Sequence, residues 1–341
     1  MLIQLFRRAI LHNIGSMSLS GFTGEMMKVL VTGGAGFIGS HIVEQLLKMK
    51  MNVIVLDNFC TGKKENLNFS PSSSPSSLEI VKGDIRDEKM VAKVMKGVDF
   101  VFHEAALRSV PRSIDDPIST NNVNITGTLN LLIAAKNEKV KRFIYASSSS
   151  VYGDTKELPK KELQKPQPIS PYAVSKLTGE YYCQVFSKTF GLETVSLRYF
   201  NVFGPRQDPE SKYAVVVPIF IYCGLKNKPF EVHSDGKQSR DFTYIDNVVS
   251  ANILSLTAKN VSGKVFNIAC NKKHSILEIA YNVGKVLGIK PKFVYKPKRV
   301  GDVRHTLADI TFAGKILKYK PLINFEDGMK KTVEYFRKFY A

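Results

Sequence analysis

A glycine-rich segment near the start of the chain constrains the fold more than any other feature. The segment TGGAGFIG (residues 32–39) follows an apolar, strand-like run and opens a helical pattern. Gly33 permits a tight turn, Gly36 lets the backbone approach a bound pyrophosphate, and Gly39 lets the helix pack closely on the strand. Free N–H groups at the start of such a helix attract phosphate. The segment therefore predicts a strand–turn–helix unit that binds a dinucleotide.

The chain from this segment to about residue 200 alternates between strand-like and helical stretches. We expect strands at 28–31, 52–56, 78–81, 99–102, 142–146 and 194–198, and helices at 37–50, 87–96, 117–136 and after Pro171. Strands separated by helices of this length imply a parallel, doubly wound sheet of the Rossmann type, an α/β fold. The looser pattern beyond residue 200 predicts a smaller mixed α/β lobe that binds substrate.

The same pattern predicts how the chain divides. We expect a disordered leader at 1–26, a dinucleotide-binding domain at 27–200 to which the chain returns near 236–262, and a substrate lobe at 201–235 and 263–341. The Ser/Pro-rich stretch 70–77 is expected to be a surface loop. No apolar run is long enough to span a membrane.

Charge and cysteine content restrict the partners. The chain has 49 Lys and Arg against 30 Asp and Glu, a net charge of +19. This excess fits a nucleic-acid binder, an enzyme with an anionic substrate, or a solvated surface. Because no nucleic-acid-binding motif accompanies the charge, we expect no nucleic-acid partner. The four cysteines form no C-x-x-C pair, so we expect no metal site and free thiols in a reducing cytoplasm.

The residue at the end of the second strand bears on the choice of cofactor. Asp57 follows Gly36 by 21 residues. A carboxylate there accepts hydrogen bonds from the ribose hydroxyls of a dinucleotide and repels a 2′-phosphate, which favours NAD over NADP. Lys63 and Lys64 lie nearby in the sequence and leave NADP open.

A tyrosine and a lysine four residues apart form a candidate acid–base pair. Tyr172 and Lys176 share one face of a predicted helix. A phenol has a pKa of about 10, and lowering it by three units takes about 4 kcal/mol. An ammonium about 4 Å away supplies roughly that much at an effective dielectric constant of about 20. Ser148 and Ser149, just after the fifth strand, are placed to relay a proton. Taken alone, the pair occurs often by chance and is better explained as exposed polar residues of a helix.

The motifs together resemble one family, the extended short-chain dehydrogenases/reductases, from residue 27 almost to the end. The resemblance rests on TGGAGFIG, LDN (56–58), GDIR (83–86), HEAA (103–106), SSSSVYGD, SPYAVSK (170–176), RYFNVFGPRQDP (198–209) and SRDFTYIDN (239–247). Within the family, the chain is most similar to the NAD-dependent UDP-hexose 4-epimerases. The stretches 107–117 and 301–309 resemble the branch that interconverts UDP-N-acetylglucosamine and UDP-N-acetylgalactosamine.

The resemblance implies a role for particular residues. Catalysis would fall to Ser148, Tyr172 and Lys176, with Ser149 as a helper. The cofactor site would comprise Gly33, Gly36, Phe37, Ile38, Gly39, Asp57, Asn58, Asp84, Ile85, Ala105, Ala106, Asn124, Tyr172 and Lys176. The UDP-sugar site would comprise Arg108, Ser109, Ser148, Tyr172, Asn201, Val216, Arg240, Arg299, Asp302 and Thr306. A homodimer through the helices near 117–136 and 171–190 is also implied.

Two serines distinguish among the reactions of the family. Hexose 4,6-dehydratases carry Asp-Glu after the catalytic hydroxyl, and UDP-glucuronate decarboxylases keep a Glu at the position of Ser150. This chain has Ser149 and Ser150 there, so the acid for those reactions is missing. A ketone formed at C4 can then only be reduced again, and reduction from the other face inverts C4. UDP-glucuronate 4-epimerases share the serine run but usually have Thr in place of Asn201.

The choice of sugar rests on one position. Thr306 aligns with a bulky Tyr in relatives restricted to glucose, so the smaller side chain leaves room for a 2-acetamido group. Added room permits this substrate without demanding it, so a UDP-glucose 4-epimerase, a UDP-glucuronate 4-epimerase, and a dehydratase or decarboxylase stay as alternatives. A non-catalytic NAD-binding scaffold is the alternative outside enzymes.

Overall fold

The computed structural model describes residues 27–69, 77–211, 215–298 and 303–340. The predicted leader 1–26, most of the predicted Ser/Pro loop, and the candidate residues Arg299 and Asp302 lie outside the described residues.

A seven-stranded parallel sheet forms the centre of the molecule, in the order β11-β6-β5-β4-β1-β2-β3. The strands are β1 (Lys28–Thr32), β2 (Asn52–Asp57), β3 (Leu78–Lys82), β4 (Phe100–His103), β5 (Arg142–Ser148), β6 (Thr194–Tyr199) and β11 (Lys264–Ile268). The strand order reverses between β1 and β4, and a doubly wound sheet binds its ligand at the carboxyl ends of the strands at such a point. The predicted Rossmann fold is confirmed.

The six predicted strands are all present, and their carboxyl ends extend one or two residues further than expected. The seventh strand, β11, falls within 263–341, the part of the chain assigned above to the substrate lobe, yet it pairs with β6 along its whole length. The alternation of strands and helices loosens beyond residue 200, so the sequence pattern did not place β11 in the sheet.

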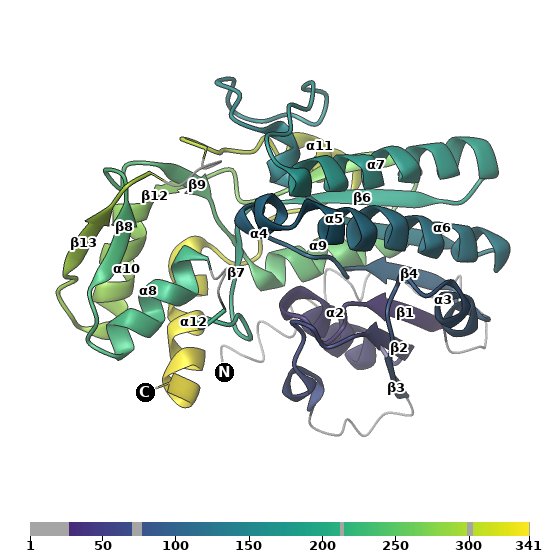
Figure 1. Cartoon of the computed structure of the whole chain (residues 1–341), viewed down its shortest axis with the longest axis horizontal. Helices are drawn as coiled ribbons and strands as arrows, with labels where there is room; N and C mark the ends of the chain where they lie inside the picture. Colours follow the sequence, from purple (N-terminus) through teal and green to yellow (C-terminus); the bar gives the residue numbers. More distant parts are fainter. Residues whose placement is uncertain (1–26, 70–76, 212–214, 299–302, 341) are drawn as a thin grey trace.

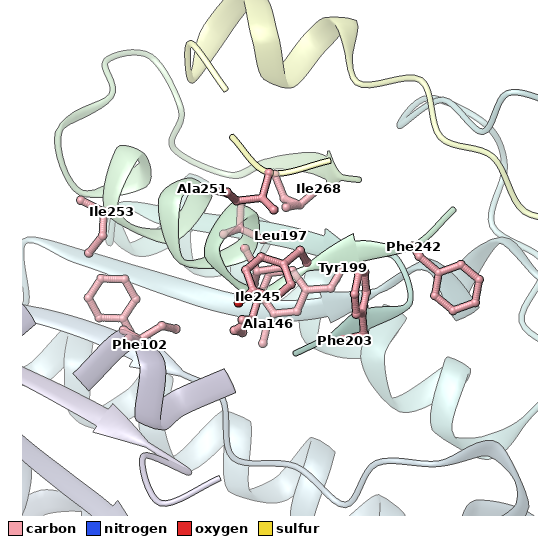
Figure 2. Close-up of a cluster of buried hydrophobic side chains, with 14 of the residues drawn as sticks. Phe102, Ala146, Leu197, Tyr199, Phe203, Phe242, Ile245, Ala251, Ile253 and Ile268 are labelled. Carbon is pink, nitrogen blue, oxygen red and sulfur yellow. The ribbon is translucent and has the colours of Figure 1, made fainter. Parts of the chain in front are cut away.

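Helices cover both faces of the sheet (Figure 1). One face carries α2 (Phe37–Lys48) and α9 (Ile245–Thr257), and the other carries α3 (Glu88–Met95), α6 (Gly127–Asn137) and α7 (Pro171–Phe190). Alternate strand residues point to opposite faces, so Val29 and Val31 belong to one core cluster and Leu30 to the other. Figure 2 shows the first cluster, which contains Phe102 and Leu197 of the sheet and Ile245 and Ile253 of α9.

The helix predicted at 117–136 is interrupted. It consists of α5 (Pro117–Asn121), a π-helical turn η3 (Asn122–Thr126) and α6. The side chain of Asn124, in this wider turn, accepts a hydrogen bond from the N–H of Leu107 and donates one to the carbonyl of Leu107. It also donates to the hydroxyl of Ser175. A one-residue widening barely disturbs the apolar periodicity, so the sequence predicted a continuous helix.

The helix predicted after Pro171 begins and ends where local chemistry requires. Ser170 caps the N-terminus of α7 by accepting a hydrogen bond from the N–H of Ala173, and Pro171 occupies the first turn. Gly191 ends the helix in a left-handed conformation with φ = 72°. These caps fix the start of the helix that carries Tyr172 and Lys176.

The second lobe is smaller and mixed, as predicted (Figure 1). Its parallel strand pair, β8 (Phe230–His233) and β13 (Phe293–Lys296), packs with α8 (Val216–Leu225), α10 (Ile276–Leu287) and α12 (Phe325–Tyr340). Shorter elements elsewhere in the described chain are α4 (Val110–Asp115), α11 (Thr311–Ile316), β7 (Val202–Phe203), β9 (Ser239–Asp241), β10 (Thr243–Tyr244) and β12 (Lys273–Ser275). Over the described ranges, no helix has both the length and the apolar character to cross a membrane.

Candidate active site

A pocket lies along the carboxyl ends of the central strands, next to the start of α2. Most of the predicted cofactor residues line it. They are Gly33, Gly36, Phe37, Ile38, Gly39, Asp57, Asn58, Asp84, Ile85, Ala105, Ala106, Tyr172 and Lys176, and the predicted substrate residue Arg108 lies among them.

The glycine turn is shaped by close backbone approaches. Gly33 has φ = 67°, and a Cβ there would lie 2.7 Å from the backbone nitrogen of Ala105. A Cβ on Gly39 would lie 2.2 Å from the carbonyl oxygen of Gly33. Gly36 precedes α2, whose first turn has neither a capping side chain nor an acidic residue. The first N–H groups of α2 are therefore open to an anion, which fits the pyrophosphate of a dinucleotide.

Asp57 ties the glycine turn to the end of β2. One carboxylate oxygen accepts a hydrogen bond from the N–H of Ala35 at 2.9 Å, and the other accepts one from the N–H of Phe59 at 2.8 Å. Burial raises the pKa of this carboxyl, while the two backbone hydrogen bonds act against the rise. Each oxygen keeps a second lone pair, so the side chain can also accept from a ribose hydroxyl. This geometry fits the adenosine half of NAD.

The two lysines that left NADP open have other contacts. The ammonium of Lys63 lies 3.1 Å from the carboxylate of Asp208, and that of Lys64 lies 5.9 Å from the centre of the Phe59 ring. A lysine held by a carboxylate is a weaker site for a 2′-phosphate, so the balance stays with NAD.

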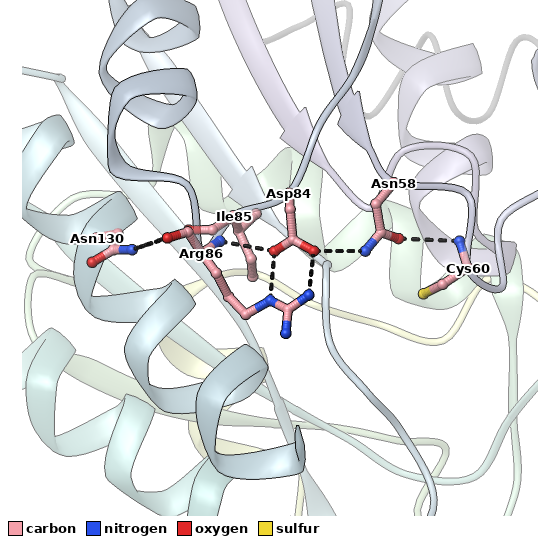
Figure 3. A network of polar contacts seen from close by, with 6 residues as sticks. All are labelled: Asn58, Cys60, Asp84, Ile85, Arg86 and Asn130. Carbon is pink, nitrogen blue, oxygen red and sulfur yellow. Dashed lines mark hydrogen bonds and ion pairs between the residues drawn. The ribbon is translucent and has the colours of Figure 1, made fainter. Parts of the chain in front are cut away.

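A polar network borders the same end of the pocket (Figure 3). The Arg86 side chain donates two hydrogen bonds to Asp84, and the amide of Asn58 donates a third at 3.0 Å. These contacts hold the pKa of Asp84 well below its usual range, with the Arg86 hydrogen bond as the largest cause. On the other side, Asn130 of α6 donates to the carbonyls of Ile85 and Arg86. The loops after β2 and β3 are thus held in one arrangement.

The candidate catalytic groups meet at the end of β5. After Ser148 the chain enters a 3₁₀ turn, η4 (Ser149–Tyr152), and the Ser148 hydroxyl accepts a hydrogen bond from the N–H of Ser150. The Ser148 side chain is also close enough to the phenol of Tyr172 to lower the pKa of that phenol by hydrogen bonding. Ser149 begins the 3₁₀ turn and is half-buried. The structure therefore brings Ser148 and Tyr172 into contact, as a proton relay requires.

Lys176 is oriented by β5. Its ammonium donates a hydrogen bond to the carbonyl oxygen of Ala146 at 2.7 Å and lies 5.1 Å from the centre of the Tyr145 ring. Burial lowers the pKa of Lys176 to about 8. The ammonium is thus held against the strand while it lines the pocket beside Tyr172.

The electrostatics of Tyr172 differ from the sequence expectation. Burial raises the pKa of Tyr172, and the groups that act against the rise are the Ser148 hydrogen bond and the guanidinium of Arg108. We expected the Lys176 ammonium, with help from an oxidised nicotinamide, to make this phenol acidic; in the protein by itself the cation that acts on the pKa is Arg108. The physical reason is that Lys176 is directed at the Ala146 carbonyl, which the four-residue spacing could not show.

Two of the predicted ligand-contacting residues shape the loop around Arg108 instead of lining the pocket. Asn124 is buried and binds Leu107 and Ser175, as described above. Ser109 has φ = 101° and caps α4 by accepting a hydrogen bond from the N–H of Arg112. Both hold the segment that presents Arg108.

The predicted substrate residues of the second half of the chain partly converge. The amide of Asn201 donates to the carbonyl of Asp241 at 3.0 Å and to the hydroxyl of Thr306 at 3.4 Å. Arg240 precedes Asp241 on β9, and its guanidinium donates to the carbonyls of Ser239 and Arg304. These segments lie more than 100 residues apart at their extremes, yet they form one hydrogen-bonded cluster. Val216 instead begins α8.

Sequence reasoning missed several residues that border the site. Glu104, Ala146, Ser147 and Tyr199 line the pocket. Glu104 and Tyr199 stand inside the motifs HEAA and RYFN, so a signal was present without a role attached to it. Behind the site, the Ser147 hydroxyl donates to Glu180, which forms a fully buried, two-bond ion pair with Arg198.

Comparison with known proteins agrees with this geometry. The sequence model of the NAD dependent epimerase/dehydratase family matches residues 29–269. UDP-glucose 4-epimerase from Thermotoga maritima, solved with UDP-glucose, is similar in structure, with a TM-score of 0.87, 39% identity, and coverage of 92% of this chain and 100% of that one. UDP-N-acetylglucosamine 4-epimerase from Methanobrevibacter ruminantium, in complex with UDP-N-acetylmuramic acid, gives a TM-score of 0.87 at 41% identity and covers 92% and 99%. UDP-glucose 4-epimerase from Thermus thermophilus, complexed with NAD, gives 0.84 at 36% identity and covers 92% and 100%.

Proposed function

This chain belongs to the NAD dependent epimerase/dehydratase family, and we propose that it inverts C4 of UDP-N-acetylglucosamine and UDP-N-acetylgalactosamine. UDP-glucose and UDP-galactose are proposed as further substrates. The coarser statement, an NAD-dependent epimerase of the UDP-sugar 4-epimerase kind, follows from family membership and from the similar structures.

The contact between Ser148 and Tyr172, beside the pocket that Tyr172 lines, carries the proposal. A hydroxyl and a phenol in contact can pass a proton to and from a sugar oxygen. The next two positions, Ser149 and Ser150, supply no carboxylate, so nothing in this turn can expel a hydroxyl at C6 or assist a decarboxylation. Inversion at C4 is the reaction that these groups support.

In the proposed reaction Tyr172 takes the proton of the C4 hydroxyl and later returns it, while Ser148 orients the sugar oxygen and relays the proton. Bound NAD supplies the reversible oxidation of C4. Lys176 keeps a positive charge beside the phenolate, and Arg108 adds a second one. Because acid and base are the same residue, the two half-reactions balance and the protein ends in its starting protonation state.

We assign residues to the two ligands from the pocket lining and the contacts above and, for Arg299 and Asp302, which lie outside the described residues, from the resemblance. We propose that the glycine turn, Phe37 and Ile38 receive the pyrophosphate, and that Asp57, Asn58, Asp84 and Ile85 border the adenosine. We propose that Ala105 and Ala106 border the nicotinamide side. Asn201 and Arg240 would hold the UDP, together with Arg299 and Asp302 and with Ser109 and Val216 nearby. Firm binding of UDP leaves the hexose free to turn over, which places binding energy on the part that does not react.

The preference for N-acetyl sugars rests on Thr306. Its side chain is short and lies within the cluster formed by Asn201 and Asp241 at the end of β9. A larger side chain at this point would fill space next to the UDP-binding residues. We therefore propose that Thr306 leaves room for the 2-acetamido group.

The test is to incubate the NAD-loaded protein separately with UDP-N-acetylglucosamine, UDP-glucose and UDP-glucuronate and to resolve the products by chromatography. We expect inversion of UDP-N-acetylglucosamine at C4, slower inversion of UDP-glucose, and none of UDP-glucuronate. A stable keto sugar would support a dehydratase, and released carbon dioxide would support a decarboxylase. Unchanged substrates would contradict the proposal.

We also propose that the enzyme is a homodimer through α5 and α7. These helices pack side by side (Figure 1), and Ile118 on α5 is 73% exposed. Val174, Tyr181 and Val185 are exposed at helical spacing along α7. A second copy would cover these apolar side chains. Light scattering should report a dimer for the unmodified chain and a monomer for Ile118→Glu with Val185→Glu, and a monomer in both would contradict the assignment.

The chain division and the compartment are proposals as well. We assign 27–200 with the return near 236–262 to NAD binding, and 201–235 with 263–341 to UDP-sugar binding, apart from β11. The four cysteines are free thiols. Such thiols persist in a reducing compartment, so we propose a cytoplasmic enzyme that binds no nucleic acid.

A further inference from the structure

Asn267 is a buried amide at which separate parts of the chain meet. It lies on β11, directly opposite Arg198 of β6, and is fully buried. The amide oxygen accepts a hydrogen bond from the hydroxyl of Tyr152 at 2.7 Å. The amide nitrogen donates to the carbonyls of Lys160 at 2.9 Å and Asp309 at 3.2 Å. The side chain thus uses both of its donors and its oxygen, which an amide of this size alone can do.

Each partner of Asn267 belongs to a different part of the site. Tyr152 ends η4, the turn that follows the proposed catalytic serine. Lys160 lies in the loop that joins η4 to α7. The third partner ends the segment 303–309, which carries Thr306. Asn267 therefore links the catalytic turn to the segment that is proposed to set the size of the sugar site.

One edge of the segment 303–309 pairs with that loop. The N–H of Lys160 donates to the carbonyl of Leu307 at 2.7 Å, and the N–H of Asp309 donates to the carbonyl of Lys160 at 2.8 Å. The two chains run parallel here, in a short bridge outside the named strands. Because the amide of Asn267 binds the carbonyls of both Lys160 and Asp309, it holds the bridge against β11.

The other edge of the segment 303–309 pairs with β9. The N–H of Thr306 donates to the carbonyl of Ser239 at 3.0 Å, and the N–H of Ala308 donates to the carboxylate of Asp241 at 3.2 Å. The hydroxyl of Thr306 also accepts from the N–H of Asp241 at 3.4 Å. These contacts fix the segment to β9, while the contacts of the first edge fix it to the catalytic turn.

The phenol of Tyr152 is oriented by its surroundings. The guanidinium of Arg198 lies 4.7 Å from the centre of its ring and donates to the carbonyl of Glu162 at 3.3 Å. The carboxylate of Glu162 in turn accepts a hydrogen bond from the N–H of Asn267 at 2.9 Å. The ring is thus held beside β6 and β11, with its hydroxyl directed at the Asn267 amide.

We propose that Asn267 is a positioning residue for sugar selectivity, which holds Thr306 at a fixed place relative to the catalytic turn. The inference rests on the proposed function, because it assigns part of the discrimination between N-acetylated and plain UDP-hexoses to a residue outside the pocket lining. An N-acetyl group beside Thr306 depends on where the segment lies. A hydroxyl in its place reaches less far and depends on the segment less.

The first arm of the experiment measures kcat/KM for UDP-N-acetylglucosamine and for UDP-glucose with the NAD-loaded enzyme and with Asn267→Asp. The carboxylate keeps the size of the side chain and presents an oxygen where the carbonyls of Lys160 and Asp309 need a donor. We expect the ratio of the N-acetylated to the plain sugar to fall by about 10-fold or more. Most of the loss should appear in KM for the N-acetylated sugar, because the proton relay is unaltered.

A milder variant keeps the test decisive if Asn267→Asp does not fold. Tyr152→Phe removes one hydrogen bond of the amide and keeps the buried ring beside Arg198. We expect the same ratio to fall by about 2- to 10-fold, as the loss of a single hydrogen bond implies.

Asn247→Asp is the matched control. Asn247 is an equally buried amide on α9, which donates to the carbonyl of Ile323 at 2.8 Å and accepts from the N–H groups of Leu322 and Ile323. It holds the loop before α12, outside the pocket lining. Both Asn→Asp substitutions should lower the free energy of unfolding, but the ratio of kcat/KM in Asn247→Asp should match that of the parent enzyme.

The second arm needs no substrate. Amide hydrogen exchange in the NAD-loaded protein, followed by mass spectrometry, should be about 10-fold faster in the segment 303–309 and around Lys160 in Asn267→Asp than in the parent. Asn247→Asp should leave exchange there unchanged. Absence of epimerisation by the parent enzyme would overturn the proposed function, while this arm would still decide whether Asn267 holds the segment.

Three results would overturn the inference. One is an unchanged ratio of kcat/KM in Asn267→Asp or, if that variant does not fold, in Tyr152→Phe. Another is an equal change of the ratio in Asn247→Asp, which would assign the effect to lost stability. The third is exchange in the segment 303–309 that does not respond to Asn267→Asp.

Discussion

The cofactor end of the site and the proposed sugar end are built in different ways. The cofactor end comes from short contiguous segments, each at the carboxyl end of one strand, such as TGGAGFIG after β1 and Asp57 at the end of β2. The sugar end is assembled from Asn201, β9 and Thr306, which contact one another across long stretches of chain.

The difference determines how much each end tolerates. At the cofactor end the backbone makes the shape, because a Cβ on Gly33 or Gly39 would collide with main-chain atoms. At the sugar end side chains make the shape through hydrogen bonds of 3.0 to 3.4 Å. We therefore expect the cofactor end to tolerate few substitutions and the sugar end to accept substitutions that change specificity.

The largest effect should come from the residue at which the two ends meet. Tyr172→Phe removes the hydroxyl that accepts the sugar proton, and we expect kcat to fall by about 10² to 10⁴. The amount of NAD that co-purifies should change much less than kcat, since Tyr172 is one of many residues that line the cofactor pocket. Tyr181→Phe, an exposed tyrosine of the same helix, is the matched control. Equal turnover in all three proteins would show that the phenol is not the base.

The second-largest effect should be a loss of stability on breaking the buried ion pair between Glu180 and Arg198. Glu180→Gln leaves the buried guanidinium of Arg198 without its charge partner, and we expect the free energy of unfolding to fall by about 3–5 kcal/mol. Urea denaturation measures the change. Glu193→Gln breaks the ion pair with Arg142, and the lost carboxylate is about half exposed, so we expect no more than about 1 kcal/mol. Similar losses in the two variants would mean that burial does not set the strength of the pair.

A substitution confined to the sugar end should change specificity more than stability. Thr306→Tyr should lower kcat/KM for UDP-N-acetylglucosamine about 10- to 200-fold relative to UDP-glucose, by filling the proposed 2-acetamido space. Retained activity with UDP-glucose serves as the internal test of folding. Thr306→Ser, which keeps the hydroxyl bound to Asn201, should preserve the original preference. An equal loss for both sugars would remove Thr306 from the specificity argument.

The smallest effect should come from the rim of the cofactor end. Lys63→Ala breaks an ion pair with Asp208 whose side chains are 50% and 31% exposed. Exposed pairs contribute about 0.2–1 kcal/mol, so NAD affinity should weaken by no more than about fivefold. Lys64→Ala is the control, and calorimetric titration with NAD is the measurement. A much larger loss would show that this pair helps to close the pocket.

Prediction from the sequence succeeded where the information was local. The glycine turn, Asp57 and the pair Tyr172 and Lys176 were placed correctly beside one pocket, because motifs and strand ends fix their positions. The sequence could not show in which direction a side chain points. Lys176 points at a backbone carbonyl, and the cation that acts on Tyr172 is Arg108.

Long-range pairings account for the other omissions. The hydrogen bond between Tyr199 and Glu104 joins residues 95 positions apart, and β11 pairs with β6, with Lys264 opposite Val195. Neither contact leaves a periodic trace in the sequence. The motifs HEAA and RYFN marked the positions of Glu104 and Tyr199 but not the bond between them.

The π-helical turn η3 has a consequence for the outer surface of the protein. Each residue of an α-helix advances the chain by about 100° around its axis, so one extra residue in the turn rotates α5 by that angle relative to α6. Because of this rotation, the side chain of Asn124 lies toward Leu107 and that of Ile118 lies toward solvent. Deleting one residue from η3 would swing both away together. The rotation of α5 relative to α6 thus affects both the loop that carries Arg108 and the exposed apolar side chains of α5.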